Sequence, residues 1–358
     1  MLFEPYALRG LSLKNRMVMA PMTRNRATAD HVPTPIMATY YAQRADLGLL
    51  ITEGASPSPD GLGYARIPGL YSDEQVAAWK PITAAVHAKG GKIFAQLMHT
   101  GRASHALNLP AGARVVGPVS VALPDPMYTD AQGMQPATVP HALTEAEVHA
   151  VVAEYAHSAT KAIEAGFDGI ELHAANGYLI EQFLNGNHNT RTDAYGGSAE
   201  ARNRFALEVA AAAVTAIGAD RVGIRISPYG AFNDMGAFDG IDGQFTALVQ
   251  GMSNLGLVYL HLVDHSSMGS PSAPASLRAT LRAAFNGTFI ASGGFDRAKA
   301  EATLASKEAD LIAFGRVALA NPDLALRLEQ NAELNAPDFA TFYTPGAAGY
   351  TDYPALSA

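Results

Sequence analysis

Eight short apolar runs, separated by longer segments, constrain the fold of this 358-residue chain more than any other feature. In chain order they read "NRMVMAPM", "LLITEGA", "KIFAQLMHT", "GIELHAA", "VGIRISP", "VYLHLVD", "FIASGG" and "LIAFGRV". Segments such as "DEQVAAWKPITAAVHAKG" and "TEAEVHAVVAEYAHSATKAIEAG" lie between them and have helical periodicity. Strands that alternate with helices indicate a parallel sheet, and eight such strands close a (β/α)8 barrel. We therefore predict an α/β fold in which residues 1–358 form a single domain, a (β/α)8 TIM barrel.

An open, doubly wound sheet is the alternative that the same alternation allows. Such sheets commonly carry G-x-G-x-x-G after a strand, but the nearest match here, at Gly61 and Gly63, lacks the third glycine. Ser72 and the capping box that begins at Thr144 mark two helix starts. Residues 101–141, after the third strand, are rich in Pro, Gly and Ala and have no helical period. We expect them to form an excursion over the mouth of the barrel.

The composition narrows the setting in which such a barrel works. The chain has no cysteine, which excludes disulfides, thiolate catalysis and Cys-ligated metal sites. Its net charge of −8 gives no reason to expect nucleic acid or an anionic membrane as a partner. Glu4 and Arg9 interrupt what would be the apolar part of a signal sequence, and no apolar run approaches the roughly 18 residues of a membrane span. We expect a cytoplasmic protein.

In such a barrel the site lies at the carboxyl ends of the strands. Residues 168–184, "DGIELHAANGYLIEQFL", place His173, Asn176 and Tyr178 where the fourth strand ends and helical spacing begins. None of the strand ends carries a lysine, which counts against a Schiff-base aldolase. The other strand ends contribute Pro21, Met22, Thr23, Ala55, Gln96, His99, Arg225, Asp264, His265, Gly293, Gly294, Gly315 and Arg316.

The ends of the last two strands are candidates for a phosphate site. Gly293 and Gly294 let the backbone approach an anion closely, and Arg316 is able to pair with it through two hydrogen bonds. A tight turn with no ligand is the alternative for the two glycines. Arg225, inside the barrel mouth, needs an anionic partner or an electron-rich ligand, because an unpaired buried guanidinium is costly. A structural salt bridge to a carboxylate is the alternative there.

The motifs together resemble those of the Old Yellow Enzyme family of flavin-dependent ene-reductases. They are "APMTRNRA", "EG" after the second strand, "QLMHTGR", "HAANGYLIEQFLN", "RTDAYGGS", "RISP", "SGG", "FGR" and "FYTPGAAGYTDYP". The resemblance runs from about Leu2 to Pro354 with the motifs in order. Each motif is weak alone, but the ordered set is specific.

The resemblance implies a non-covalent FMN across the barrel mouth. Thr23 would hydrogen-bond the O4 side of the flavin, Gln96 and Arg225 would face its pyrimidine edge, and a glycine and arginine set would hold its phosphate. Phe342 and Tyr343 resemble the aromatic pair at the flavin edge and the substrate mouth. The implied cofactor-binding residues are Pro21, Met22, Thr23, Ala55, Gln96, Arg225, Gly293, Gly294, Gly315, Arg316 and Phe342.

The resemblance also implies the reaction, NADPH-dependent reduction of the activated C=C bond of α,β-unsaturated carbonyl compounds and, as a further class, nitro compounds. His173 and Asn176 would donate to the carbonyl oxygen, which assigns the chain to the His/Asn subgroup, and Tyr178 would protonate the α-carbon. The nicotinamide would use the same pocket as the enone, although the residues do not distinguish NADPH from NADH. Met98 departs from the family's usual Trp. The implied substrate-binding residues are Thr23, Tyr64, Met98, His173, Asn176, Tyr178 and Tyr343.

Two other classes of function stay open at this point. A metal-dependent barrel hydrolase would use His99, His173, Asp264 and His265, but no H-x-H follows the first strand. A non-catalytic flavin-binding protein would have no need of Tyr178. We expect no metal. The sequence leaves the physiological substrate, the oligomeric state and the course of residues 265–275 undetermined.

Overall fold

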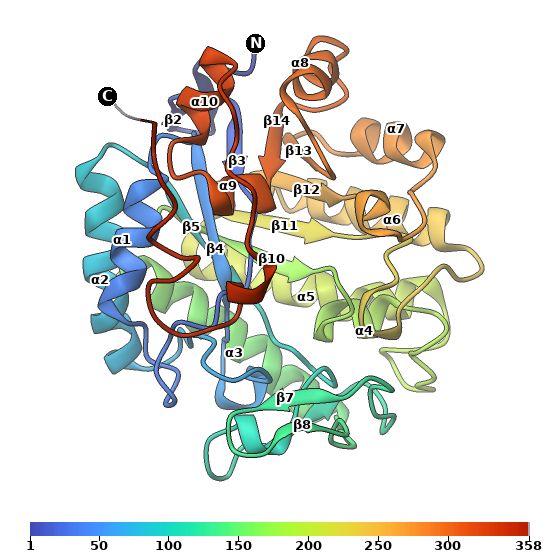
Figure 1. Cartoon of the computed structure of the whole chain (residues 1–358). Helices are drawn as coiled ribbons and strands as arrows, with labels where there is room; N and C mark the ends of the chain where they lie inside the picture. Colours follow the sequence, from blue (N-terminus) through green and yellow to red (C-terminus); the bar gives the residue numbers. More distant parts are fainter. Residues whose placement is uncertain (357–358) are drawn as a thin grey trace.

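The eight apolar runs form a closed, all-parallel barrel with the strand order β10-β11-β12-β13-β14-β3-β4-β5 (Figure 1). This computed structural model describes residues 1–356. Both the predicted strands and the predicted closure are confirmed, and the open doubly wound sheet is not formed. The barrel strands are β3 (Met17–Met19), β4 (Leu49–Ala55), β5 (Ile93–Leu97), β10 (Gly169–Ala174), β11 (Val222–Ile226), β12 (Tyr259–Val263), β13 (Thr288–Ser292) and β14 (Leu311–Phe314).

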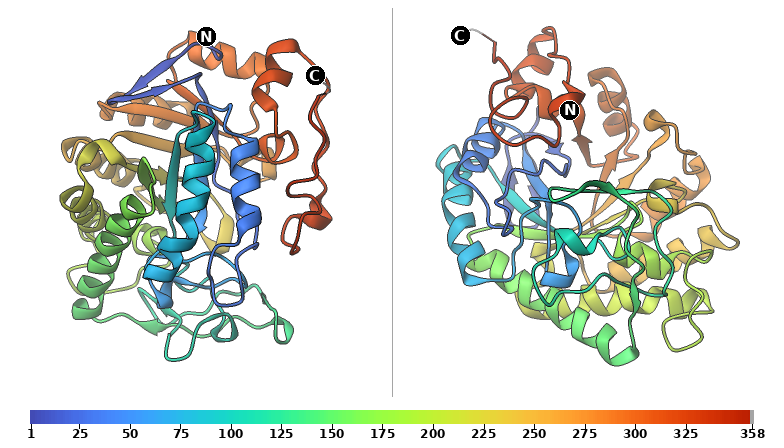
Figure 2. Two further views of the ribbon diagram at one scale, coloured as in Figure 1. Left: turned by 90° about the vertical axis from the view of Figure 1, so that its left-hand side faces the viewer. Right: turned by 60° about the horizontal axis from the view of Figure 1, so that its bottom comes forward.

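Helices follow the strands and surround the barrel, as Figure 2 (left) shows for the neighbouring α1 and α2. The Ser72 side chain accepts a hydrogen bond from the Gln75 amide at the start of α2, and Thr144 with Glu147 forms the capping box of α3. Both predicted helix starts are therefore confirmed. The helices are α1 (Pro35–Gln43), α2 (Asp73–Ala88), α3 (Glu145–Glu164), α4 (Leu179–Leu184), α5 (Ala199–Ile217), α6 (Ile241–Asn254), α7 (Ala275–Ala284), α8 (Arg297–Ala305), α9 (Arg316–Ala320) and α10 (Leu324–Gln330).

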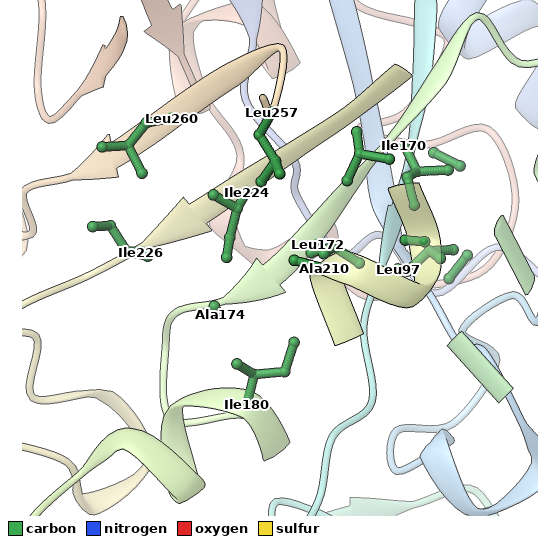
Figure 3. Packing of buried hydrophobic residues seen from close by; sticks show 14 of the residues in the cluster. Leu97, Ile170, Leu172, Ala174, Ile180, Ala210, Ile224, Ile226, Leu257 and Leu260 are labelled. Carbon is green, nitrogen blue, oxygen red and sulfur yellow. The ribbon is translucent and has the colours of Figure 1, made fainter. Parts of the chain in front are cut away.

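Alternate residues of each strand face the helices or the barrel interior. On β10, Ile170, Leu172 and Ala174 belong to the large apolar cluster that the strands share with the helices. Figure 3 shows these side chains beside Ala210 of α5 and Ile180 of α4. The residues between them on the strand therefore face the interior, where the site is to be built.

The amino-terminal end of the barrel is closed and packed. The hairpin of β1 (Tyr6–Leu8) and β2 (Leu11–Leu13) contributes Leu8 and Leu13 to an interior cluster with Phe94 and Tyr259. A Cβ atom on Gly169 would lie 2.5 Å from the Phe94 ring, and one on Gly223 would lie 2.3 Å from the Tyr259 ring. Glycine is required at these two interior positions because the aromatic rings fill the space, which leaves the carboxyl end for the site.

The excursion after β5 lies at the carboxyl end of the barrel, as predicted (Figure 2, right). Its residues Ala103, Leu123 and Met127 form a cluster against which Tyr64 and Tyr178 pack. The excursion contains four short strands: β6 (Val116–Gly117), β7 (Met127–Thr129), β8 (Gly133–Gln135) and β9 (His141–Ala142). It therefore covers one side of the mouth beside the predicted catalytic residues.

Candidate active site

A polar layer lies in the barrel interior directly above the aromatic layer. The Gln96 amide nitrogen Nε2 donates to Oε1 of Glu171 at 2.8 Å, and Oε2 of Glu171 lies 2.8 Å from Nδ1 of His261. The three side chains come from β5, β10 and β12 and are almost fully buried. Burial lowers the pKa of His261, so the neutral imidazole donates its Nδ1 proton to the carboxylate.

Arg225 lies in the same layer on β11, between His173 and His261 in the strand register. Among residues 1–356 its guanidinium makes no hydrogen bond and no ion pair within 4.0 Å, and its Nε is buried without a partner. Burial lowers the pKa of Arg225. The salt bridge considered from the sequence is not formed, so the buried cation is left for a ligand.

His173 and Asn176 are brought together at the end of β10. Asn176 adopts the left-handed conformation, with φ of 61°, and the following Gly177 has φ of 71°. Nδ1 of His173 and Oδ1 of Asn176 are buried and have no partner within the described part of the chain. Burial and the nearby Arg225 charge lower the pKa of His173 well below its usual range. The imidazole is therefore neutral at neutral pH and is able to donate one hydrogen bond to a ligand.

The backbone of this turn is held from two sides. The Asn176 amide donates to Oγ of Ser227 at 2.9 Å, and Ser227 donates to Oε1 of the Glu181 carboxyl group at 3.0 Å. The Gly177 amide also donates to Glu181 at 2.5 Å, and Nδ2 of Asn233 donates to the Asn176 carbonyl at 2.7 Å. These bonds fix an unusual backbone conformation and leave the Asn176 side chain free for a ligand.

Tyr178 directs its hydroxyl to Tyr64 at the edge of the excursion. The two hydroxyl oxygens lie 3.3 Å apart, and the two rings meet edge to face at 6.2 Å. The Tyr178 ring also packs at 4.9 Å on the imidazole of His173. Burial and Tyr64 raise the pKa of Tyr178 well above its usual range, so the phenol keeps its proton at neutral pH.

Met98 lies behind these two tyrosines. It is only 1% exposed and forms a cluster with Leu62 and Ile67, against which Tyr64 and Tyr178 pack. A Cβ atom on Gly54 would lie 2.5 Å from the Met98 sulfur, so the thioether fills the space over that glycine. Met98 therefore belongs to the buried cluster that supports Tyr64 and Tyr178.

The glycine and arginine ends of β13 and β14 are neighbours, because Ser292 pairs with Ala313 in the sheet. Gly293 and Gly294 have φ of 151° and 60°, and a Cβ atom on Gly293 would lie 2.7 Å from the Asp264 carbonyl oxygen. Arg316 packs over the Phe339 ring at 5.8 Å and makes no hydrogen bond or ion pair among residues 1–356. This arrangement leaves a guanidinium beside a turn that only glycine is able to form.

Residues of the loop after β3 hold the C-terminal segment against the barrel. Arg24 donates to the carbonyls of Phe342 (3.1 Å) and Gly349 (2.6 Å), and Arg26 donates to the Phe342 carbonyl at 2.6 Å. The Arg24 guanidinium also lies 5.6 Å from the Phe342 ring. The loop that contains Pro21, Met22 and Thr23 and the segment that contains Phe342 and Tyr343 are thus tied together.

Arg66 connects three segments around the mouth. It donates to the carbonyl of Asn25 at 3.3 Å, donates to the carbonyl of Tyr343 at 3.3 Å, and forms an ion pair with Asp130 of the excursion. Met22 and Thr23 are partly exposed, whereas Ala55 is fully buried and its carbonyl accepts the Met98 amide proton.

Several residues of the site were missed in the sequence. Glu171 and His261 occupy inward positions of apolar strands. Side chains alternate between the two faces of a strand, and the alternation that places Gln96 and Arg225 in the interior also places Glu171 and His261 there. Ser227 and Glu181 carry no comparable signal, because their role appears only when the turn after β10 meets the end of β11.

The donor set fits FMN. The buried, unpaired Arg225 is a partner for an electron-rich ring edge, and the unpaired Arg316 beside Gly293 and Gly294 is a partner for a phosphate. In residues 1–356, the side chains that a metal-dependent hydrolase would use are not brought together as a metal site. Within residues 1–356 there is no group of three or more His, Asp or Glu residues that could hold a metal ion.

Comparisons with known sequences extend along almost the whole chain. The model of the NADH:flavin oxidoreductase / NADH oxidase family matches residues 1–335. The 12-oxophytodienoate reductase 7 of Oryza sativa subsp. japonica is 44% identical over 383 aligned residues, which cover 99% of this chain and 94% of the relative. A probable flavin mononucleotide-dependent alkene reductase of Leishmania infantum is 42% identical over 357 residues, with 99% and 97% covered.

Solved structures are similar over the same length. Morphinone reductase has a TM-score of 0.95 at 41% identity, with 99% of this chain and 96% of that chain covered. The old yellow enzyme homologue from Zymomonas mobilis has a TM-score of 0.94 at 39% identity, with 99% of both chains covered. Another structure of morphinone reductase is a complex with tetrahydroNAD. In the described part of this chain, no helix is long and apolar enough to cross a membrane.

Proposed function

The chain belongs to the NADH:flavin oxidoreductase / NADH oxidase family, the Old Yellow Enzyme family that its motifs resemble, and we propose how its own residues carry out the reaction. It is an FMN-dependent oxidoreductase that takes hydride from a nicotinamide dinucleotide and reduces the activated C=C bond of α,β-unsaturated carbonyl compounds. The barrel, the excursion and the C-terminal segment act as one catalytic domain.

Two sets of residues hold the cofactor. Gln96 and Arg225 would bind the pyrimidine edge of the flavin, where the buried guanidinium would stabilise negative charge. Gly293, Gly294, Gly315 and Arg316 would hold the phosphate through backbone amides and one guanidinium. Pro21, Met22, Thr23, Ala55 and Phe342 complete the cofactor site from the loops after β3 and β4 and from the C-terminal segment. Bound FMN supplies hydride transfer from the nicotinamide to the β-carbon of the alkene.

His173 and Asn176 bind the carbonyl oxygen of the enone. The buried, unpartnered Nδ1 of His173 and the neutral state of its imidazole support this role, and Asn176 would donate through Nδ2 of its amide. Negative charge grows on the carbonyl oxygen as hydride arrives at the β-carbon, and two donors held in place stabilise that charge. With these two residues as donors, the chain falls in the His/Asn subgroup.

Tyr178 protonates the α-carbon of the alkene. Its phenol keeps its proton at neutral pH and packs on His173, which puts a general acid next to the carbonyl-binding pair. Tyr64 accepts a hydrogen bond from Tyr178 and so holds its hydroxyl. Thr23, Met98 and Tyr343 complete the substrate-binding residues.

We assign NADPH as the reductant, and its nicotinamide occupies the same pocket as the enone, so the two ligands bind in turn. Rates of anaerobic flavin reduction with NADPH and with NADH at equal concentrations test this assignment. A faster reaction with NADH would overturn it. Inhibition of flavin reduction by saturating enone tests the shared pocket, because independent sites would give no competition.

The observation that carries the proposed function is the buried, unpartnered Arg225 beside the His173–Asn176 turn. The first experiment is the visible spectrum of the purified protein. We expect about one FMN per chain that is released on denaturation, because the chain has no cysteine to which a flavin could be linked. A colourless protein that takes up no flavin would contradict the proposal.

A further inference from the structure

The carboxylate of Glu171 determines which atom of the Gln96 amide faces the barrel mouth. An ionised carboxylate only accepts hydrogen bonds, so Nε2 of Gln96 must face Oε1 of Glu171, at 2.8 Å. The amide oxygen of Gln96 then lies on the opposite side of the carboxamide group. Gln96 is therefore held as a hydrogen-bond acceptor toward its ligand.

Glu171 is itself held in place by a side chain from another strand of the barrel. Its second oxygen lies 2.8 Å from Nδ1 of His261, which is on β12, two strands away. The intervening strand β11 puts Gly223 opposite Glu171 in the register, so no side chain separates the carboxylate from the imidazole. Both partners are 0% exposed, and the contact is therefore shielded from water.

Among the charged groups that act on Arg225, the Glu171 carboxylate contributes the largest favourable effect. The two residues face the interior from neighbouring strands, and the carboxylate favours the charged state of the guanidinium without bonding to it. Because the two side chains form no hydrogen bond or ion pair, the guanidinium stays free for a ligand. It also makes the local charge of the site depend on Glu171.

We propose that Glu171 is a positioning residue beneath the cofactor, which fixes the Gln96 amide as an acceptor and lowers the reduction potential of FMN by opposing the positive charge of Arg225. This inference rests on the proposed function and extends it to a residue that does not touch the flavin. Glu171 thus has two effects, one on the orientation of the Gln96 amide and one on the charge beside Arg225.

The charge claim is tested by Glu171→Gln, which keeps the size of the side chain and removes its charge. Reduced flavin gains negative charge, so the variant holds reduced FMN more tightly relative to oxidised FMN. We expect that ratio of affinities to rise about tenfold, which corresponds to about +30 mV for a two-electron couple. Glu208→Gln is the matched control, because Glu208 lies on α5 outside the barrel, where it accepts a hydrogen bond from the Tyr195 hydroxyl, and the variant changes net charge equally. Equal potentials in all three proteins would overturn the charge claim.

The geometric claim is tested by a double-mutant cycle on the affinity for oxidised FMN. Glu171→Gln allows the Gln96 amide to turn over, so we expect it to weaken FMN binding in the wild-type background. In the Gln96→Leu background the same change should have no further effect, because the group that Glu171 positions is absent. Additive losses would overturn the positioning role.

The outcomes separate this inference from the proposed function. A wild-type protein that binds no FMN contradicts the proposed function itself, before any variant is made. A wild-type holoenzyme with unchanged affinity and potential in Glu171→Gln overturns only the role of Glu171. If Glu171→Gln does not fold, Glu171→Met replaces it in both experiments, since an apolar side chain of similar size also removes the charge and the acceptor that faces Gln96. An unchanged potential and FMN affinity in that variant would equally overturn the inference.

Discussion

The hydroxyl of Tyr178 lies 3.3 Å from the hydroxyl of Tyr64, and no charged group is within hydrogen-bond distance of this pair in residues 1–356. The excursion packs over both rings through Leu123 and Met127. A phenol in such surroundings does not ionise at neutral pH, and burial keeps the pKa of Tyr64 raised as well. The pair is therefore a proton donor and its support rather than a source of negative charge.

Replacing Tyr178 by Phe should separate the two half-reactions. We expect enone reduction to slow by about 10²- to 10⁴-fold, the usual loss when a general acid is removed, while flavin reduction by NADPH stays nearly unchanged. Anaerobic stopped-flow measurement of each half-reaction checks this. Tyr64→Phe is the matched control and should have a much smaller effect on enone reduction. Equal losses in both half-reactions of Tyr178→Phe would mean that Tyr178 has a structural role.

Replacing His173 and Asn176 together by Ala should weaken the binding of phenols and the turnover of enones far more than FMN binding. In the proposed reaction the His173 imidazole and Nδ2 of Asn176 both donate to the carbonyl oxygen, and loss of one oxyanion donor typically costs about 3–4 kcal/mol. A phenolate places an anionic oxygen where the enone carbonyl binds, and titration of its charge-transfer band with the flavin gives its affinity. An unchanged phenolate affinity would place the carbonyl site elsewhere.

Met98→Trp should narrow the range of substrates. Met98 is buried behind Tyr64 and Tyr178, so a larger ring pushes the tyrosines toward the substrate, and overpacking should cost about 1–3 kcal/mol of stability. Turnover and enantiomeric excess with 2- and 3-substituted cyclohexenones check the effect. Met98→Leu is the control, since it conserves volume. Parallel substrate profiles and unchanged product chirality for Met98→Trp would show that this position does not shape the site.

The stability of the protein should fall as the pH rises toward 8, in part because of Glu181. Burial raises its pKa from 4.5 to about 8, so between these values the folded protein retains a proton that the unfolded chain has released. Folding is therefore favoured at the acidic end of this window and loses that contribution as the pH rises through the folded pKa. Glu181→Gln should flatten the dependence of Tm on pH across the window. Glu53, whose pKa burial raises to about 7, leaves a residual slope of the same sign. An unchanged slope in Glu181→Gln would contradict the assignment.

The fold was predictable from the sequence because its signals are local. The eight strands are short apolar runs, and the starts of α2 and α3 are marked by Ser72 and Thr144 within one turn of each helix. The family and the cofactor followed from ordered motifs. In the site, the period of two along β10 and β12 identifies Glu171 and His261 once the strands are known, although neither was recognised.

Other parts of the site depend on contacts that no local pattern records. Arg24 and Phe342 meet although 318 positions separate them, and Glu181 reaches Ser227 across 46 positions. Such contacts appear only when the strand ends and the C-terminal segment are brought together at the mouth. The motif predicts Ala55 at the cofactor, but its full burial and the hydrogen bond from the Met98 amide to its carbonyl could not be anticipated from sequence.

The most direct test of the account is the reaction of the NADPH-reduced holoenzyme with 2-cyclohexenone in the absence of oxygen. We expect the visible absorption of oxidised FMN to return in a single turnover, with one equivalent of cyclohexanone formed per flavin. A flavin that stays reduced in the presence of the enone, and is oxidised only when oxygen is admitted, would contradict the assignment of this protein as an ene-reductase.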